Sequence, residues 1–245
     1  LIFNVTDPVF SDVRMRRAFS LAIDRDGMLA AVYDGRGSPR ILFGGEPWGR
    51  SEEEIRQLPG WRDAKDQDIA EAKRLMAEAG YPDGLEVELL TRDSSPYVAF
   101  TEYYAGELRK IGVDAKVRSV DTATQYDLGN AGEFQIISQR FAMASGHPDE
   151  VVGGYFITDA ARNYFQYSNP VVDDLFLKMS GALDPDVKRD YIHQLEEILL
   201  EDAVMAFTAD VEMEWATWSY VKGYTMPITK YMDSYTLDQV WLLPH

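Results

Sequence analysis

The segment Arg92–Tyr97 places a cation, two hydroxyls and a tyrosine where a strand is expected to give way to a helix. A helix that begins at these serines would present free backbone N–H groups and the positive end of its dipole, which can hold a carboxylate or a phosphate. We therefore expect Arg92, Ser94, Ser95 and Tyr97 to contact a ligand. The alternative for Arg92 is a plain surface cation at the end of a strand.

A second group of ligand-type residues falls in two irregular segments. Residues 36–62 form a long predicted loop that contains Trp48, and a later loop holds Phe141, Ser145 and His147. Loops of this length commonly serve a function. We expect these four residues to contact the ligand, with Phe141 as a stacking wall for a sugar, an opine-like conjugate or a heterocycle. Trp48 would cover a cleft, or alternatively fix its loop to its own lobe.

The sequence carries none of the usual patterns of an enzyme or a metalloprotein. It has no cysteine, and its three histidines are not spaced as metal ligands are. There is no nucleophile elbow, no GxGxxG turn and no GK[ST] phosphate loop. We therefore predict no catalytic residue, no metal, no cofactor and no enzyme activity.

Charge and hydropathy restrict the partners. The 245 residues include 41 acidic and 24 basic ones, which gives a formal net charge of −17. An acidic surface repels phosphate backbones, so we expect no nucleic-acid partner. No apolar run reaches the roughly 20 residues of a membrane-spanning helix. Residue 1 falls inside a predicted strand, and we expect no signal peptide in this sequence.

The hydrophobic pattern predicts an α/β fold. Residues 69–79 have apolar side chains at helical spacing, preceded by Asp66 or Asp68 as a cap and followed by Gly80. Residues 85–120 alternate strand, helix and strand at the spacing of a parallel βαβ unit. Further helices are expected to begin after Ser11, Asp24, Asp121, Asn169 and Asp184, and further strands to cover residues 1–5, 134–138 and 204–208.

Five motifs, in order along the chain, resemble those of the family 5 extracellular solute-binding proteins, which serve ABC importers of the oligopeptide, dipeptide and nickel type. Any one of these motifs is common, but five in the right order and spacing are specific. They extend over nearly the whole chain, at Phe3–Arg25 (FNVTDPVFSDVRMRRAFSLAIDR), Ala72–Gly84 (AKRLMAEAGYPDG), Leu108–Val113 (LRKIGV), Tyr167–Asp173 (YSNPVVD) and Val221–Tyr224 (VKGY).

The resemblance implies a periplasmic-binding-protein-like lobe with a mixed sheet flanked by helices. Full members of the family have two lobes joined by crossover strands, and the motifs found here belong to their second half. Residues 1–204 are therefore expected to form the second, ligand-cleft lobe, and residues 205–245 to return towards a first lobe that this sequence lacks. The aromatic residues between 215 and 241 would pack on that lobe, or alternatively form a local core.

The resemblance also implies a function. A protein of this family captures a peptide or another small solute between its lobes. It then delivers the solute to the permease subunits of an ABC importer, in the periplasm or outside the cell. Two alternatives remain open, a ligand-sensing or chaperone-like relative without transport and a hydrolase.

Two departures from the peptide-binding members concern the ligand. Those members have an arginine for the ligand carboxylate near the helix start, where this chain has Val98. They also have an aspartate for the ligand ammonium, where this chain has Ala144 or Ser145. Asp149 is close by but displaced in register. A buried ammonium needs a carboxylate partner, so an ordinary free-amine peptide is not the expected ligand.

Overall fold

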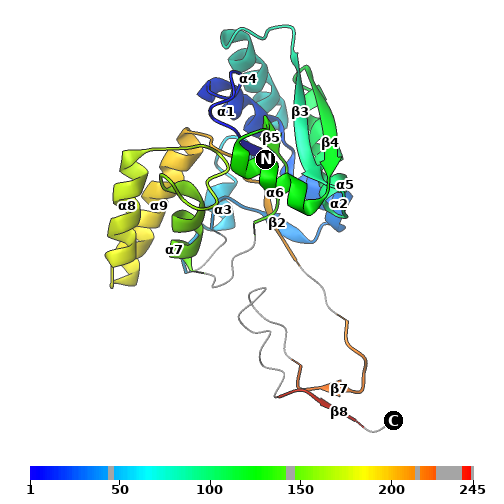
Figure 1. Ribbon diagram of the computed structural model, residues 1–245, viewed down its shortest axis with the longest axis vertical. Coiled ribbons are helices and arrows are strands. Elements are labelled where there is room, and N and C mark those ends of the chain that lie inside the picture. Colours follow the sequence, from blue (N-terminus) through cyan, green and yellow to red (C-terminus); the bar gives the residue numbers. More distant parts are fainter. Residues whose placement is uncertain (44–46, 142–146, 213–215, 225–238, 244–245) are drawn as a thin grey trace.

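The computed structural model describes residues 1–43, 47–141, 147–212, 216–224 and 239–243. Its main body is a sheet with helices on both faces, and a narrow C-terminal segment extends from one end (Figure 1). The strands are β1 (Ile2–Phe3), β2 (Gly37–Pro39), β3 (Leu85–Arg92), β4 (Val113–Val120), β5 (Ile136–Ile137), β6 (Ala209–Val211), β7 (Val221–Lys222) and β8 (Trp241–Leu242). The helices are α1 (Val13–Ala22), α2 (Arg25–Tyr33), α3 (Glu52–Ile55), α4 (Lys65–Glu78), α5 (Tyr97–Arg109), α6 (Thr122–Ala131), α7 (Pro148–Val151), the π-helical turn η1 (Val152–Phe156), α8 (Pro170–Gly181) and α9 (Pro185–Glu201).

The central sheet is mixed, with strand order β1-β5-β3-β4. β3 runs parallel to β4, from the pair Leu85 and Val113 to the pair Arg92 and Val120. β3 is also parallel to β5, whereas β1 is antiparallel to β5. Because α5 connects β3 to β4, the predicted parallel βαβ unit is confirmed, and with it the mixed α/β sheet.

The segment after α9 returns to the edge of this sheet. Leu1 and Ala206 exchange two hydrogen bonds, at 2.9 and 2.8 Å, and the backbone N–H of Phe3 donates to the carbonyl of Val204. The regular strand follows at β6, where it pairs with β2 in a separate antiparallel ribbon. The predicted strand over 204–208 is therefore placed a few residues too early, since those residues only bridge to β1.

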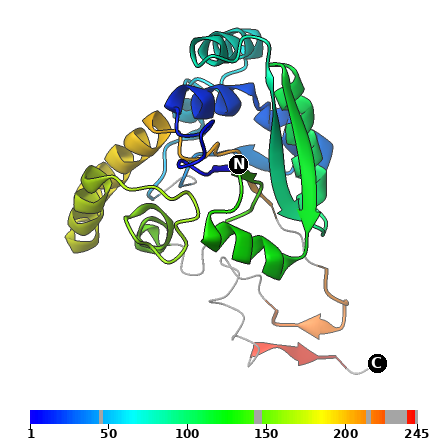
Figure 2. The ribbon, with the colours of Figure 1, turned by 45° about the horizontal axis from the view of Figure 1, so that its top comes forward.

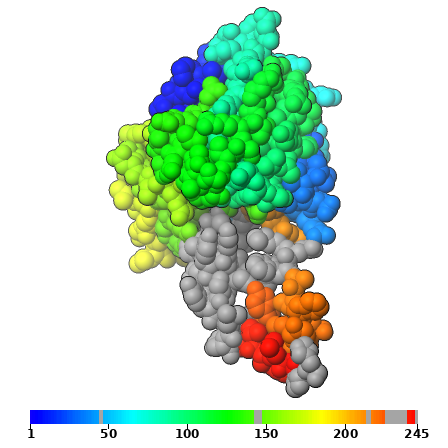
Figure 3. All heavy atoms as spheres, turned by 45° about the vertical axis from the view of Figure 1, so that its right-hand side comes forward, coloured from blue at the N-terminus to red at the C-terminus, as the bar shows by residue number. Residues whose placement is uncertain are grey.

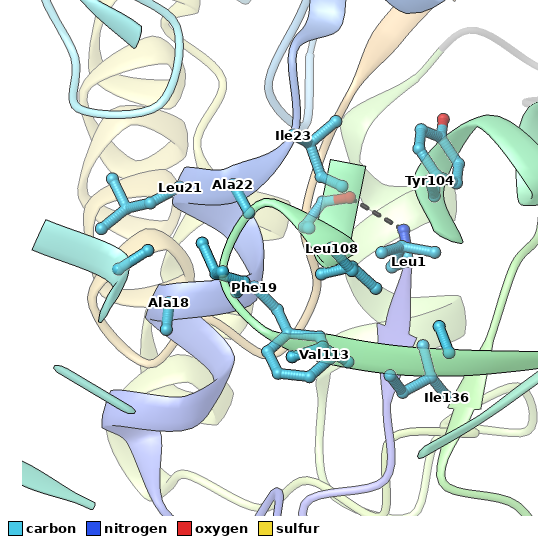
Figure 4. Close-up of a cluster of buried hydrophobic side chains, with 14 of the residues drawn as sticks. Leu1, Ala18, Phe19, Leu21, Ala22, Ile23, Tyr104, Leu108, Val113 and Ile136 are labelled. Carbon is cyan, nitrogen blue, oxygen red and sulfur yellow. Dashed lines mark hydrogen bonds between the residues drawn. The ribbon is translucent and has the colours of Figure 1, made fainter. Parts of the chain in front are cut away.

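The side chains of the sheet alternate between two hydrophobic cores, because successive strand residues point to opposite faces. Leu89 and Leu90 of β3 lie in different cores, and Ile136 and Ile137 of β5 do the same. The first core is completed by α1, α4 and α5, and Figure 4 shows Phe19 of α1 within it. The second core is completed by η1, α8 and α9. Each large apolar side chain buried there contributes about 2 kcal/mol.

Side-chain caps determine where several helices begin. Asp24, Asp121, Asn169 and Asp184 each accept a hydrogen bond from a backbone N–H of the first helical turn, as predicted. Each of these side chains satisfies a donor that the helix itself leaves unpaired. Local sequence is sufficient here because the cap and its partner are only two or three residues apart.

The caps predicted for α1 and α4 are wrong. α1 is capped by Asp12 rather than Ser11, and α4 begins at Lys65, before both Asp66 and Asp68. Asp68 is fully buried inside α4 and accepts a hydrogen bond from the backbone N–H of Gly60 at 3.1 Å. Its carboxylate therefore fastens the preceding loop to the helix, which is a tertiary contact that a capping pattern does not reveal.

Strands β7 and β8 lie away from the body in Figure 1, and Figure 3 shows this coloured C-terminal part projecting below the body. The two strands pair with each other, and the Trp218 ring stacks on Tyr220 while the Trp218 side chain stays 73% exposed. Residues 205–211 still pack on the body, through β6 and the buried Phe207. The division into residues 1–204 and 205–245 stays a prediction. Among the described residues, no helix is long and apolar enough to span a membrane.

Candidate functional site

The carboxyl ends of β3, β4 and β5 meet at one edge of the sheet. Arg92 is the last residue of β3, Val120 is the last of β4, and Phe141 follows β5. Figure 2 shows the arrowheads of β3 and β4 directed towards the side on which the C-terminal segment lies. In open α/β sheets, ligands bind at this carboxyl edge, so we take it as the candidate site.

The Arg92 guanidinium lies between two tyrosine rings. Its Cζ atom is 4.8 Å from the centre of the Tyr97 ring and 4.7 Å from the centre of the Tyr126 ring. Its Nε donates to Oε1 of Gln125 at 2.7 Å, and its Nη1 donates to the Tyr97 hydroxyl at 3.4 Å. The rings attract the cation through their negative faces and restrict its movement.

Gln125 links the Arg92 guanidinium to the backbone of the segment after β5. Its side chain is 1% exposed, and its Nε2 donates to the Ser138 carbonyl at 3.5 Å. Asp121 caps α6 and so places Gln125 one turn into the helix, beside the ends of β3 and β5. Ser138 is itself fully buried, and its hydroxyl has no hydrogen-bond partner within the described parts of the chain.

A row of aromatic rings continues from Arg92 across the edge. The centre of the Tyr126 ring lies 6.4 Å from that of Tyr164, which lies 6.5 Å from that of Tyr155. The Tyr155 ring is in edge contact with Phe141 at 4.6 Å. We refer to Tyr97, Tyr126, Tyr155 and Tyr164 as the tyrosine row. Offset and edge contacts of this kind stabilise such rings in fixed positions.

A second arginine, Arg162, contacts the tyrosine row at Tyr155. Its Nη1 donates to the Tyr155 hydroxyl at 3.0 Å, and this bond raises the pKa of Arg162. Burial raises the pKa of Tyr164, while Arg162 and Arg92 both act to lower it. The charges of Arg92, at the end of β3, and of Arg162, after η1, therefore both favour the ionised form of the Tyr164 hydroxyl.

A third contact joins Trp48 and His147, whose ring centres are 5.8 Å apart. His147 Nδ1 lies 2.6 Å from Oδ2 of Asp149, and that same oxygen accepts from Lys188 Nζ at 3.0 Å. Burial opposes ionisation of Asp149, but hydrogen bonds from Ser180 and Lys188 hold its pKa below the usual value. Asp149 thus ties α7 to α8 and α9, and its carboxylate is already engaged within the protein.

The structure brings some of the predicted site residues together and separates others. Arg92 and Tyr97 are in contact, and Trp48 contacts His147. Phe141 packs on the tyrosine row. Ser145 lies outside the described residues.

Ser94 and Ser95 are exposed, and neither side chain caps α5, the helix that was expected to begin at these serines. The helix begins after Pro96 without a side-chain cap, and the Ser94 carbonyl accepts from Tyr97 N–H at 2.8 Å. The two serines form the turn that carries the chain from the end of β3 to α5. Their predicted contact with a ligand remains untested.

Sequence reasoning missed five residues of this site, namely Gln125, Tyr126, Tyr155, Arg162 and Tyr164. For the first two a usable signal existed, because Asp121 follows a strand and starts a helix at the sheet edge. For the other three no local pattern was available. They lie in η1 and the irregular segment after it, and tertiary packing brings them to the edge.

Two hollows of the described surface lie elsewhere. One, of about 310 Å³, is lined by Asn130, Thr158, Asn163 and Ser168, and the other, of about 500 Å³, by Asn4, Asp7 and Gln135 among others. Neither is lined by a predicted ligand residue. Within the described residues, no group of three or more histidine or acidic side chains is arranged to hold a metal ion.

Comparison with known proteins agrees with this fold. The chain is 25% identical over 244 residues to the dipeptide-binding protein of Escherichia coli K12, a match that covers 94% of the chain and 44% of that relative. It is also 25% identical over 222 residues to the periplasmic oligopeptide-binding protein of Haemophilus influenzae, which covers 88% of the chain and 40% of that protein. The chain thus spans less than half the length of these relatives.

Solved structures show the same fold. OppA of Burkholderia pseudomallei superposes with a TM-score of 0.84 at 21% identity, covering 99% of this chain and 48% of that one. AppA of Bacillus subtilis, solved in complex with a nonapeptide, superposes with a TM-score of 0.82 at 20% identity, covering 99% and 50%. Residues 1–163 match the sequence profile of the bacterial extracellular solute-binding proteins, family 5 Middle. The chain belongs to the family 5 bacterial extracellular solute-binding proteins.

Proposed function

We propose that this chain is the ligand-cleft lobe of a two-lobe solute-binding protein that serves an ABC importer in the periplasm or outside the cell. Membership of the family supports this proposal. So does the length of the relatives, since the chain covers only 44% of the dipeptide-binding protein and 48% of the matching OppA structure. The remaining half would supply the second wall of the cleft.

One observation carries the proposal. The carboxyl ends of β3 and β4, the first of which ends at Arg92, point towards the side on which β7 and β8 lie (Figure 2). Residues that continue in that direction would enter the other lobe, and the edge would then face it across a cleft. The exposed Trp218, Trp241 and Leu242 support this view, because large apolar side chains in water favour a covering partner.

The mechanism follows from two lobes with a solute between them. Solute bound to one lobe alone makes half of its contacts, so it binds the closed form more tightly than the open one. Binding therefore shifts the population towards closure, and the permease subunits would recognise the closed form. The chain supplies the rigid sheet edge and needs no chemical step of its own.

The proposed solute is small and need not be an ordinary peptide. Asp149, a carboxylate close in sequence to the expected ammonium position, is held by Lys188 and Ser180. Ala144 or Ser145 stands where peptide-binding members have an aspartate. A peptide with a blocked amine, an opine-like conjugate or a sugar derivative fits these residues better than a free-amine peptide.

The first test is the size and shape of the protein isolated from its natural source. A two-lobe protein is expected, with a polypeptide about twice the 27.8 kDa of this chain. Addition of the bound solute should reduce its radius of gyration in small-angle X-ray scattering, because the lobes close. A natural protein of the present length, or a solute complex with unchanged dimensions, would count against the proposal.

The isolated chain provides a second test. Because it holds only one wall of the cleft, its affinity for the solute of the whole protein should be weaker than micromolar, that is, weaker than about −8 kcal/mol. Isothermal titration of the 245-residue chain measures this directly. Micromolar or tighter binding to the chain alone would contradict the two-wall arrangement.

A further inference from the structure

The hairpin of α8 and α9 exposes three large apolar side chains around its turn. Leu183, in the connection between the two helices, is 99% exposed, Leu177 of α8 is 70% exposed and Val187 of α9 is 44% exposed. We refer to these three residues as the apolar tip. The same helices bury other apolar side chains, such as Leu175 and Leu195, in the second core. The apolar tip takes no part in that core, and apolar side chains gathered on a surface favour a covering partner.

The two ends of this hairpin lie on different sides of the body. At one end, Nδ2 of Asn169, the cap of α8, donates to Oδ2 of Asp202 at 3.2 Å. The Asp202 carbonyl accepts from Nε and Nη2 of Arg16, at 2.9 and 2.6 Å, so this end lies against α1. Figure 1 shows the connection between α8 and α9 at the opposite end, directed towards the side on which β7 and β8 lie.

The turn of the hairpin is fastened to the loop that reaches the candidate site. Asp149 of α7 accepts from Ser180 Oγ at 2.8 Å and from Lys188 Nζ at 3.0 Å, with one donor on each side of the turn. His147 lies against the same carboxylate and contacts the Trp48 ring. The apolar tip therefore lies beside residues that are expected to border the cleft, and it would move together with this lobe.

The charged residues around the apolar tip are paired within the hairpin. Lys178 Nζ lies 2.6 Å from Oδ2 of Asp174, and Arg189 Nη2 lies 2.7 Å from Oδ1 of Asp186. Asp184 is used as the cap of α9. A partner recognised by its charge would have to compete with these contacts, whereas an apolar partner would cover the leucines and leave them in place. The apolar tip therefore fits an apolar protein surface.

The half of the protein that lies outside this chain can supply that surface. The chain covers 44% of the dipeptide-binding protein and 48% of the OppA structure, and the apolar tip faces the side on which the described chain ends. A stable interface between proteins buries about 800 Å² on each partner, far more than three side chains provide. A permanent dimer is therefore not expected here. A small contact suits two lobes that must separate again to release a solute.

We propose that Leu177, Leu183 and Val187 form a closure contact, which packs on apolar side chains of the absent lobe when the cleft closes and is exposed to water when it opens. This inference rests on the proposed function, because it requires a second lobe. A contact made only in the closed form raises the population of that form, since apolar surface leaves water. It therefore strengthens the apparent affinity for any solute that binds the closed form.

Photocrosslinking identifies what covers the apolar tip. The natural full-length protein carries p-benzoylphenylalanine in place of Leu183, cells that also produce the importer are irradiated, and mass spectrometry identifies the crosslinked peptides. Val171, which is 56% exposed at the other end of α8, is the matched control position. The probe at 183 should crosslink to a peptide of the absent lobe in the same polypeptide, and the probe at 171 should not. A crosslink from 183 to a permease subunit or to a second copy, or none to the absent lobe, would overturn the inference.

The contribution to closure is measured with Leu183→Ser in the full-length protein. Because Leu183 is 99% exposed, this change should leave the fold of the described lobe intact. A small-molecule extract of bacterial cells is the probe, and small-angle X-ray scattering follows the radius of gyration. Leu183→Ser should need about ten times more extract than the wild type for half of the change, because less apolar surface is buried on closure. Val171→Ser should behave as the wild type does.

The outcomes separate this inference from the proposed function. If Leu183→Ser closes at the same extract concentration as the wild type, the closure contact is wrong and the two-lobe protein stands. If the natural protein is no longer than this chain, or if the extract never changes its dimensions, the proposed function fails and the closure contact fails with it.

Discussion

Arg92 and Gln125 are thirty-three residues apart in sequence, yet Nε of the arginine donates to Oε1 of the glutamine at 2.7 Å. The first residue ends β3, and the second lies in the first turn of α6, after β4. The bond therefore joins the end of β3 to the helix that follows β4, the neighbouring parallel strand. Together with the Tyr97 and Tyr126 rings, this bond fixes the Arg92 guanidinium at the carboxyl edge.

The substitution Gln125→Met should loosen this arrangement. It keeps the volume of the side chain but removes both hydrogen bonds, to Arg92 and to the Ser138 carbonyl. We expect the free energy of unfolding to fall by about 1–3 kcal/mol, because a buried carbonyl loses its donor. Urea denaturation of the chain measures this. The exposed Gln57 offers a control, and Gln57→Met should change stability by less than about 0.5 kcal/mol. Equal stability of the two variants would contradict the role of Gln125.

Glu196 should make the stability of the protein depend on pH. Its carboxylate is buried on α9, accepts from the Phe43 N–H at 3.2 Å and lies 3.4 Å from Nε of Arg50. Burial raises the pKa of Glu196 from 4.5 to about 7. Between pH 4.5 and about pH 7, Glu196 therefore binds more protons in the folded state than in the unfolded state. The free energy of unfolding should therefore decrease as pH rises from 4.5 to about 7, by up to about 3 kcal/mol in total.

The variant Glu196→Gln tests this assignment. Its amide oxygen can still accept from Phe43 but carries no charge, so the contribution of Glu196 to the pH dependence should disappear. Urea unfolding at about pH 5 and about pH 8 should show the variant gaining stability relative to the wild type at the higher pH only. The exposed Glu201 of the same helix provides the control, because Glu201→Gln should preserve the wild-type slope. If the free energy of unfolding of Glu196→Gln depended on pH as strongly as that of the wild type, the prediction would be refuted.

Arg25 should be intolerant of its most conservative replacement. Its guanidinium is 1% exposed, donates to the carbonyls of Gly60 and Phe207, and lies 3.8 Å from the centre of the Trp61 ring. Burial lowers its pKa to about 10, so it stays charged at neutral pH. Arg25→Lys replaces a planar fork by a point charge and leaves carbonyls unpaired, which should lower the free energy of unfolding by about 2–4 kcal/mol. In the same denaturation assay, the substitution of the exposed Arg109 by Lys should leave the free energy of unfolding almost unchanged. A decrease as large as that of Arg25→Lys would contradict the role given to Arg25.

Introducing an acid at the expected ammonium position should change the ligand preference. Position 144 lies outside the described residues, so this prediction comes from the sequence motif alone. In the full-length protein, Ala144→Asp or Ser145→Asp should increase the affinity for free-amine dipeptides such as Ala-Phe by about tenfold or more, since an ammonium gains a carboxylate partner. Calorimetric titration measures the gain. Ala144→Asn has a similar shape without the charge, and an equal gain from it, or none from either aspartate, would show that the motif is aligned wrongly.

Local sequence was sufficient for much of the fold. Asp24, Asp121, Asn169 and Asp184 cap helices as expected, because the cap and the N–H groups it binds lie within one turn of each other. The βαβ unit of residues 85–120 was equally predictable. The period of its hydrophobic residues changes from two to nearly four and back, and the parallel arrangement follows from the crossover helix.

Tertiary structure decided which residues meet at the carboxyl edge. Arg92 and Tyr97 belong to one short segment, so their contact was open to sequence reasoning. Tyr126, Tyr155 and Tyr164 approach Arg92 only because β3, β5 and η1 pack around a shared core. Sequence alone determined the family, the elements and the absence of the usual catalytic motifs. Convergence of distant side chains depends on long-range packing, which no local spacing encodes, and so the charge and shape of the site appeared only in the folded chain.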